Sequence, residues 1–296
     1  MSTQCRLYGK RTFTLRRGED MKEMIFGAFQ FEMSSNIREL LDELDSLREL
    51  QSTCFNARNE HEIEANKSFE KDFINRFTCN SAAIEGSTLS PQETQLVLQG
   101  EFLPKDDREL SDMFAVRGVA EGYDYAMRDF AQGRELDEEF IKDIHERTAL
   151  DCQPRSRGSY RLSAALIAGS QVVPSSPLQI REQMADLLFA YKQSLLPSVV
   201  KACIFHALFE RIHPFVDGNG RTGRTIMNAM LVADKYAPVA LKYQDRRTYL
   251  DTLARAQIDG DYEPLISFVS AAIAEEFGKR FDMIRSTREA VERAQS

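Results

Sequence analysis

The chain has 296 residues, a hydrophobic fraction of 43% and a formal net charge of -8. Broad nucleic-acid binding usually requires a basic face, so we expect no nucleic-acid partner for this acidic chain. The five cysteines are scattered and form no CxxC pair, which argues against a disulfide framework or a zinc knuckle. No apolar run approaches the roughly 20 residues that span a bilayer, so we expect no membrane partner and a cytoplasmic location.

Most of the chain reads as helical. Residues 1–18 are basic and are interpreted as part of a flexible arm. From Asn36 onward leucines recur at three- and four-residue steps, which predicts a helix with one apolar face. Ser90-Pro91 followed by Glu93 is typical of a helix start. Further helices are predicted over residues 63–77, 108–130, 136–150 and 198–212, from residue 180, and from residue 221 to the C-terminus, whose last part, 277–295, is charge-rich.

Residues 158–177 break the helical pattern. Short apolar stretches flank a glycine-containing turn, which predicts a short β-hairpin. The open edge of such a hairpin can accept an extended peptide as an added strand. A purely structural hairpin is the alternative.

The stretch HPFVDGNGRTGR at residues 213–224 carries the chemistry. Its glycines allow consecutive N–H groups to surround one anion, and the helix expected after them adds further free N–H groups. Arg221 and Arg224 share a helix face and can clamp two phosphates. Asp217 can hold a Mg²⁺ that bridges phosphates, and His213 titrates near neutrality. The stretch therefore predicts a phosphate cradle with its own base.

Other motifs fit less well. Gly218, Gly220 and Gly223 spell GxGxxG, but a helix and not a strand precedes them, which argues against a dinucleotide-binding fold. No GxxxxGK[ST] is present, which excludes a P-loop. Neither His145-Glu146 nor His61-Glu62 has the second histidine of HExxH, which excludes that class of zinc protease.

Residues 213–224 resemble the Fic family signature HPFx[DE]GNGRxxR and match it at every defined position. The resemblance implies an all-α Fic fold and transfer of AMP from ATP to a Ser, Thr or Tyr hydroxyl of a target protein. It implies Mg²⁺, with Mn²⁺ as an alternative, and allows self-modification and a homodimer. The implied roles are His213 as the base, Phe215 as a buried anchor, Asp217 as the metal ligand, Gly218, Asn219 and Gly220 as the anion hole, and Arg221 and Arg224 on the β- and γ-phosphates.

The likeness extends to three other segments. Residues 158–177 resemble the family's flap, which implies target docking along Leu166, Ile167, Ala168 and Gly169. Residues 249–268 resemble the helices around the adenine, which implies nucleotide contacts for Tyr249 and Gln257, although relatives often have asparagine at the latter position. The stretch SAAIEG at residues 81–86 matches the inhibitory pattern [ST]xxxE[GN]. It implies that Glu85 pairs with Arg224, misaligns ATP, and in relatives of this kind can also help to remove AMP.

The expected organisation is a basic arm over 1–35, a helical region with the inhibitory motif over 36–105, a Fic core over 106–276 and a charged helix over 277–296. Two alternatives to AMP transfer stay open. One is Fic-type transfer of UMP or phosphocholine. The other is a nucleotide-sensing interaction protein, with the helix from Asn36 as a partner face. The intact His213 favours an enzyme, because binding alone requires no base.

Overall fold

The computed structural model describes residues 21–54, 60–167 and 171–295. Within these ranges every regular element is helical, and no helix is long and apolar enough to cross a membrane. The expectation of an all-α fold is confirmed. The α-helices are α1 Met21–Ala28, α2 Ser35–Cys54, α3 Glu60–Ile84, α4 Pro91–Gln99, α5 Asp107–Ala131, α6 Glu138–Thr148, α7 Ile180–Gln193, α8 Ser198–Ile212, α9 Asn219–Ala233, α10 Arg246–Asp259 and α11 Glu263–Gln295, with short 3₁₀ helices at Pro154–Ser156 and Tyr243–Asp245.

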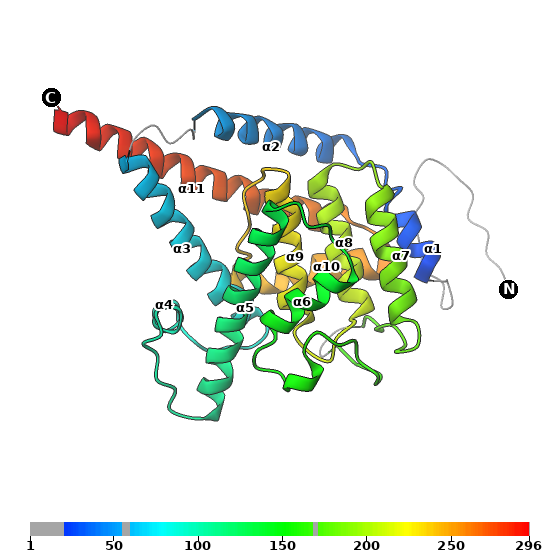
Figure 1. Ribbon diagram of the computed structural model, residues 1–296. Helices are drawn as coiled ribbons and strands as arrows, with labels where there is room; N and C mark the ends of the chain where they lie inside the picture. The colour runs from blue at the N-terminus through cyan, green and yellow to red at the C-terminus, as the bar shows by residue number, and fades with distance from the viewer. Residues whose placement is uncertain (1–20, 55–59, 168–170, 296) are drawn as a thin grey trace.

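Helices α8 and α9 form the centre of the molecule, between α5 and α6 on one face and α10 and α11 on the other (Figure 1). Nearly all residues of α8 are buried, as its continuous apolar sequence predicts. Helix α9 is also buried along most of its length. The connection between them, residues 213–218, is therefore held between two core helices, which fixes its position.

Helix α3 is attached to α11 by two buried ion pairs. Arg76 contacts Glu276 at 2.6 Å, and Arg288 contacts Glu62 at 3.0 Å. Both glutamates are buried, and a buried carboxylate is stable only when it is paired. Because Glu85 directly follows the end of α3, these pairs help to determine where its carboxylate lies. In Figure 1 the outer part of α11 runs along α2 and crosses the start of α3.

The N-terminal segment differs from the expectation of a flexible arm over 1–35. Residues 21–28 form α1, which packs against α7 and whose Met24 and Ile25 are buried. The apolar run is short and follows a basic stretch, so its periodicity was too brief to predict a helix. Residues 1–20 of the expected arm lie outside the described residues.

The expected division at residue 105 stays a prediction. Ile37 and Leu41 of α2 belong to the same hydrophobic core as α8 and α9, so the N-terminal helices share the central core. The boundary expected at residue 276 falls inside the continuous helix α11.

The predicted hairpin over 158–177 forms no strand in its described residues. Pro174 and Pro177 lack the N–H group that a strand ladder needs, which is consistent with irregular chain there. The two ends of the segment are nevertheless joined, because the Arg161 guanidinium donates to the carbonyl oxygens of Ser163 and Ser175. Ala168 and Gly169 lie outside the described residues.

The contact between α5 and the end of α6 depends on glycine. A Cβ on Gly118 would lie 2.7 Å from the carbonyl oxygen of Thr148. We expect Gly118→Ala to lower the free energy of unfolding by about 1–3 kcal/mol, because the two segments must separate. The matched control is Gly278→Ala in α11, where an added Cβ meets nothing within 4 Å. It should raise stability by up to about 1 kcal/mol through helix propensity. Urea unfolding compares the two, and equal effects would contradict the close approach.

Candidate active site

His213 lies where α8 ends, in a backbone conformation that is uncommon for a residue with a side chain (φ 52°, ψ 60°). Two hydrogen bonds hold it there. Its N–H donates to the Phe209 carbonyl at 2.9 Å, and its own carbonyl accepts from Arg161 Nε at 2.7 Å. Burial lowers the pKa of the imidazole, and its Nδ1 has no hydrogen-bond partner within the described residues. The ring is therefore neutral at neutral pH, as a general base must be.

The turn after His213 is folded around Asn219. The side-chain oxygen of Asn219 accepts from the Phe215 N–H at 2.9 Å, and its amide nitrogen donates to the Phe215 carbonyl at 3.0 Å. Phe215 is fully buried. The side chain of Asn219 is thus occupied in holding the turn, and only its backbone is left for the anion hole that the resemblance implied.

His145 supports the same turn from α6. Its ring stacks on Phe215 with centroids 3.6 Å apart. The Gly158 N–H donates to His145 Nδ1 at 2.9 Å, so Nε2 carries the proton and donates to the Asp217 carbonyl at 2.9 Å. Burial lowers the pKa of His145 to about 4, so the ring is neutral. Sequence reasoning considered this histidine only as part of an HExxH motif, although its place on the apolar face of α6 indicated burial.

Gly218 precedes α9 with φ +76°, and no side chain caps the helix N-terminus. A Cβ at this glycine would also lie 3.2 Å from the Ala149 side chain, so both the conformation and the space favour glycine. An uncapped helix N-terminus offers N–H groups and a positive dipole end to an anion. It adjoins a pocket of 170 Å³ that is lined by Glu85, Asp112, Asp151, Asp217 and Arg221, among others.

The first arginine of this site, Arg224, is paired with Glu85. Its side chain is 2% exposed, and its Nη2 lies 2.8 Å from Glu85 Oε1. Ser81 adds a hydroxyl that accepts from Nε at 3.0 Å and a carbonyl that accepts from Nη2 at 2.8 Å. Burial alone would lower the pKa of Arg224, but the carboxylate of Glu85 more than offsets this and the pKa is raised. A Cβ on Gly220 would lie 2.0 Å from Glu85 Oε1, so this carboxylate rests on the first turn of α9.

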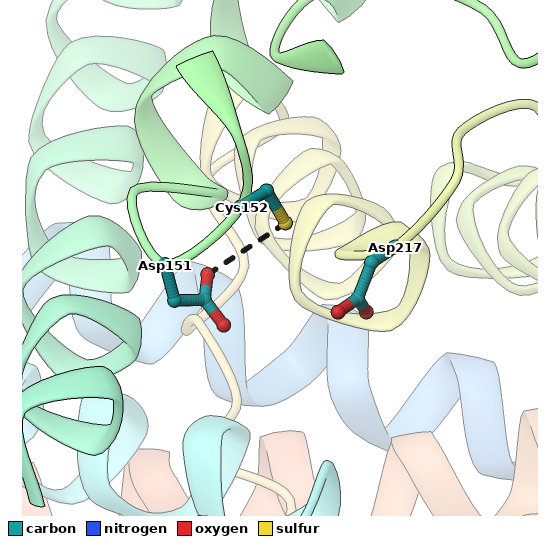
Figure 2. A group of neighbouring side chains, drawn as sticks. All are labelled: Asp151, Cys152 and Asp217. Atoms are coloured by element: carbon teal, nitrogen blue, oxygen red, sulfur yellow. Dashed lines mark hydrogen bonds between the residues drawn. The ribbon is translucent and has the colours of Figure 1, made fainter. Parts of the chain in front are cut away.

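The second arginine, Arg221, is paired with Asp151. Arg221 is 2% exposed, and its Nη1 lies 2.6 Å from Asp151 Oδ1. Figure 2 shows Asp151 and Cys152 in one loop and Asp217 facing them from another. One ligand atom from each of the three lies within 4.8 Å of the others. The Asp217 side chain is 68% exposed, and a carboxylate open to solvent can bind Mg²⁺ together with phosphate oxygens.

Two residues expected at the nucleotide are buried, and their contact with the nucleotide stays a prediction. Tyr249 is buried and its hydroxyl contacts His206 Nε2 at 2.7 Å. Gln257 is also buried, and its amide donates to the Ala207 carbonyl at 3.1 Å. Both side chains hold α10 against α8, and neither lines the pocket at α9. In the expected flap, Leu166 is 93% exposed.

Residues 135–231 match the model of the Fic/DOC family. This part of the chain is similar to that family. The matched residues run from before α6 into α9, and so include His145, His213, Asp217 and both arginines of the site.

Curated proteins that are similar to this chain include protein adenylyltransferases named Fic. The one from Nematostella vectensis is 31% identical over 195 residues, which are 64% of this chain and 45% of the relative. The one from Drosophila grimshawi is 26% identical over 245 residues, 80% of this chain and 49% of the relative. The chain is thus distantly related to protein adenylyltransferases and aligns with less than half the length of these two.

Solved structures support the same fold. A Fic domain containing signaling protein from Bacteroides thetaiotaomicron superposes with a TM-score of 0.71 at 24% identity, covering 85% of this chain and 98% of that chain. Residues 134–508 of Fic-1 from C. elegans superpose with a TM-score of 0.75 at 21% identity, covering 86% of this chain and 74% of that one. The all-α arrangement is therefore the Fic fold.

The buried neutral His145 makes stability depend on pH. Below pH 6.5 the unfolded chain protonates this histidine, whereas the folded chain does so only near pH 4, so stability falls across this window. We expect His145 to contribute a loss of about 2 kcal/mol in unfolding free energy between pH 7 and pH 5. Urea unfolding of the parent and of His145→Gln at both pH values measures it. The same pH dependence in both proteins would show that His145 is not the cause.

Proposed function

We propose that the chain transfers AMP from ATP to a Ser, Thr or Tyr hydroxyl of a target protein, and that Glu85 restrains this reaction. One observation carries the proposal. Asp217 and Arg221 line one pocket at the uncapped N-terminus of α9 together with Glu85, whose carboxylate is paired with Arg224, and His213 ends the preceding helix. The relation to protein adenylyltransferases supports AMP as the transferred group.

In this reaction His213 accepts the proton of the target hydroxyl. The hydroxyl oxygen forms a bond to the α-phosphorus of ATP, the bond from that phosphorus to the bridging oxygen breaks, and pyrophosphate leaves with the electron pair. A positioned base of this kind contributes roughly 10²–10⁴-fold to the rate. The backbone N–H groups at the start of α9 stabilise charge on the phosphate oxygens.

Arg221 and Arg224 are the cationic side chains that bind the β- and γ-phosphates. Asp217 is the residue that would hold Mg²⁺, with Mn²⁺ as an alternative, and the ion would neutralise phosphate charge. The fit rests on donor chemistry, because an exposed carboxylate beside a phosphate site is the usual protein ligand for this cation.

Glu85 acts as a brake because its carboxylate lies at the site of a phosphate. It pairs with Arg224 and rests against Gly220, so it uses the cation and the helix end that the γ-phosphate needs. ATP that binds beside it is misaligned, and small misplacements reduce transfer strongly. The Glu85 side chain is 40% exposed, so it can leave Arg224 without unfolding the core.

The segment over 158–177 is the proposed docking place of the target. Its ends are joined through Arg161, which also binds the carbonyl of His213, so a bound target strand would be positioned relative to the base. The exposed side chain of Leu166 offers an apolar contact.

Three proteins test the proposal: the parent, Glu85→Gly, and Glu85→Gly with His213→Ala. Each is incubated in cell lysate with Mg²⁺ and ATP labelled at the α-phosphate, and label on protein is measured. We expect Glu85→Gly to raise labelling at least about tenfold, because Arg224 becomes available to the nucleotide. Adding His213→Ala should reduce it by about 10²-fold or more.

Glu101→Gly is the matched control, because it removes an exposed glutamate that does not line the pocket. It should label as the parent does. Labelled UTP in a parallel reaction tests the choice of base. Equal labelling by the parent and Glu85→Gly would refute the brake, and no label from ATP in any reaction would refute AMP transfer.

A further inference from the structure

A second carboxylate, outside the 213–224 motif, is bound to Arg221. Asp151 lies in the loop after α6, and its Oδ1 is 2.6 Å from Arg221 Nη1. The same nitrogen donates to the Thr148 carbonyl at 3.4 Å. The exposed fractions of the two side chains are 2% for Arg221 and 15% for Asp151. A guanidinium buried to this degree requires a counter-charge, and Asp151 supplies it.

The loop that carries Asp151 is held on both sides of it. Arg157 donates from Nε to the Cys152 carbonyl at 3.0 Å and from Nη2 to the Leu150 carbonyl. The end of α6, directly before this loop, is joined to α9, because the Thr148 and Thr222 hydroxyls lie 2.7 Å apart. Asp151 therefore binds Arg221 from a loop that is itself held in place by hydrogen bonds.

The contacts of Arg221 with Asp151 and with the Thr148 carbonyl both use its Nη1. Its Nε is buried and has no hydrogen-bond partner within the described residues, and its Nη2 lies 3.8 Å from Asp217 Oδ1. Asp217 is thus the nearest other carboxylate to this guanidinium. If Asp151 carried no charge, Arg221 would be drawn to Asp217 as its remaining counter-charge.

We propose that Asp151 is a positioning residue for phosphate binding, which fixes Arg221 so that its contact with Asp217 stays long, at 3.8 Å. Arg221 then stays available to the β-phosphate, and Asp217 stays available to the divalent cation. Figure 2 shows the two carboxylates on separate segments that face each other. The inference rests on the proposed function and adds a residue outside its motif.

The charge of the pocket favours a long Arg221–Asp217 contact over a close one. Four carboxylates line it, those of Glu85, Asp112, Asp151 and Asp217, together with the single arginine Arg221. A polyphosphate enters such a pocket only with cations that offset its charge. Collapse of Arg221 onto Asp217 would remove a phosphate-binding cation and a metal ligand together, so ATP and Mg²⁺ binding should weaken in parallel.

The test compares Asp151→Asn and Asp151→Glu in the full chain carrying Glu85→Gly. We expect Asp151→Asn to raise both the KM for ATP and the half-saturating Mg²⁺ concentration about tenfold, with kcat changed less than about threefold. Asp151→Glu, which keeps the charge, should restore most of the loss. Asp143→Asn is the matched control, because it breaks the ion pair between Asp143 of α6 and Arg134, and neither residue lines the pocket. It should leave both quantities unchanged.

Calorimetry with tripolyphosphate and Mg²⁺ separates this inference from AMP transfer, because the probe requires neither a base nor a reaction. Asp151→Asn should bind tripolyphosphate about tenfold more weakly than its parent even if no protein is ever labelled. Equal binding, or a parent that does not bind tripolyphosphate, would overturn the positioning role. Faster transfer with a lower KM in Asp151→Asn would also overturn it, since Asp151 would then be a second brake.

Discussion

The need to neutralise two buried arginines governs this site. Arg221 and Arg224 stand one turn apart at the start of α9, and each is 2% exposed. Removing such charges from water costs several kcal/mol each unless they are paired. The chain pairs them with carboxylates from two distant segments, Asp151 after α6 and Glu85 after α3. The packing of both segments against α9 is therefore tied to the phosphate-binding side chains.

The same constraint explains which parts of the site could be predicted from sequence. The motif over 213–224 is contiguous, and a helix end, a glycine turn and a new helix follow from its residue types alone. The Arg224–Glu85 pair was predicted by resemblance to a known pattern. His145 and Asp151 were not found, because their roles depend on how α6 meets α9. His145 and the residue it supports, Asp217, are 72 positions apart, and no periodicity in the sequence connects them.

Whether an element could be predicted from the sequence depended on the length of its apolar pattern and on its distant contacts. Long periodic segments such as α8 were predicted because their apolar faces repeat over several turns. Helix α1 was missed because it has only two turns, and its stability comes from packing on α7. The segment over 158–177 has short apolar stretches around a glycine-containing turn, which predicted a hairpin. Its ends are instead joined by the Arg161 side chain, a contact that residue patterning does not encode.

Burial also determines how the proposed brake must be released. Arg224 also donates two hydrogen bonds to Ser81, and these do not involve Glu85. Arg224 is 2% exposed, and a guanidinium buried to this degree is strongly disfavoured without an anion. Departure of Glu85 is therefore favourable only when another anion takes its place. In the proposed reaction that anion is the γ-phosphate of ATP, so nucleotide binding and the departure of Glu85 are coupled. A partner that draws Glu85 outward would raise the affinity for ATP, and ATP would raise the affinity for that partner by the same factor.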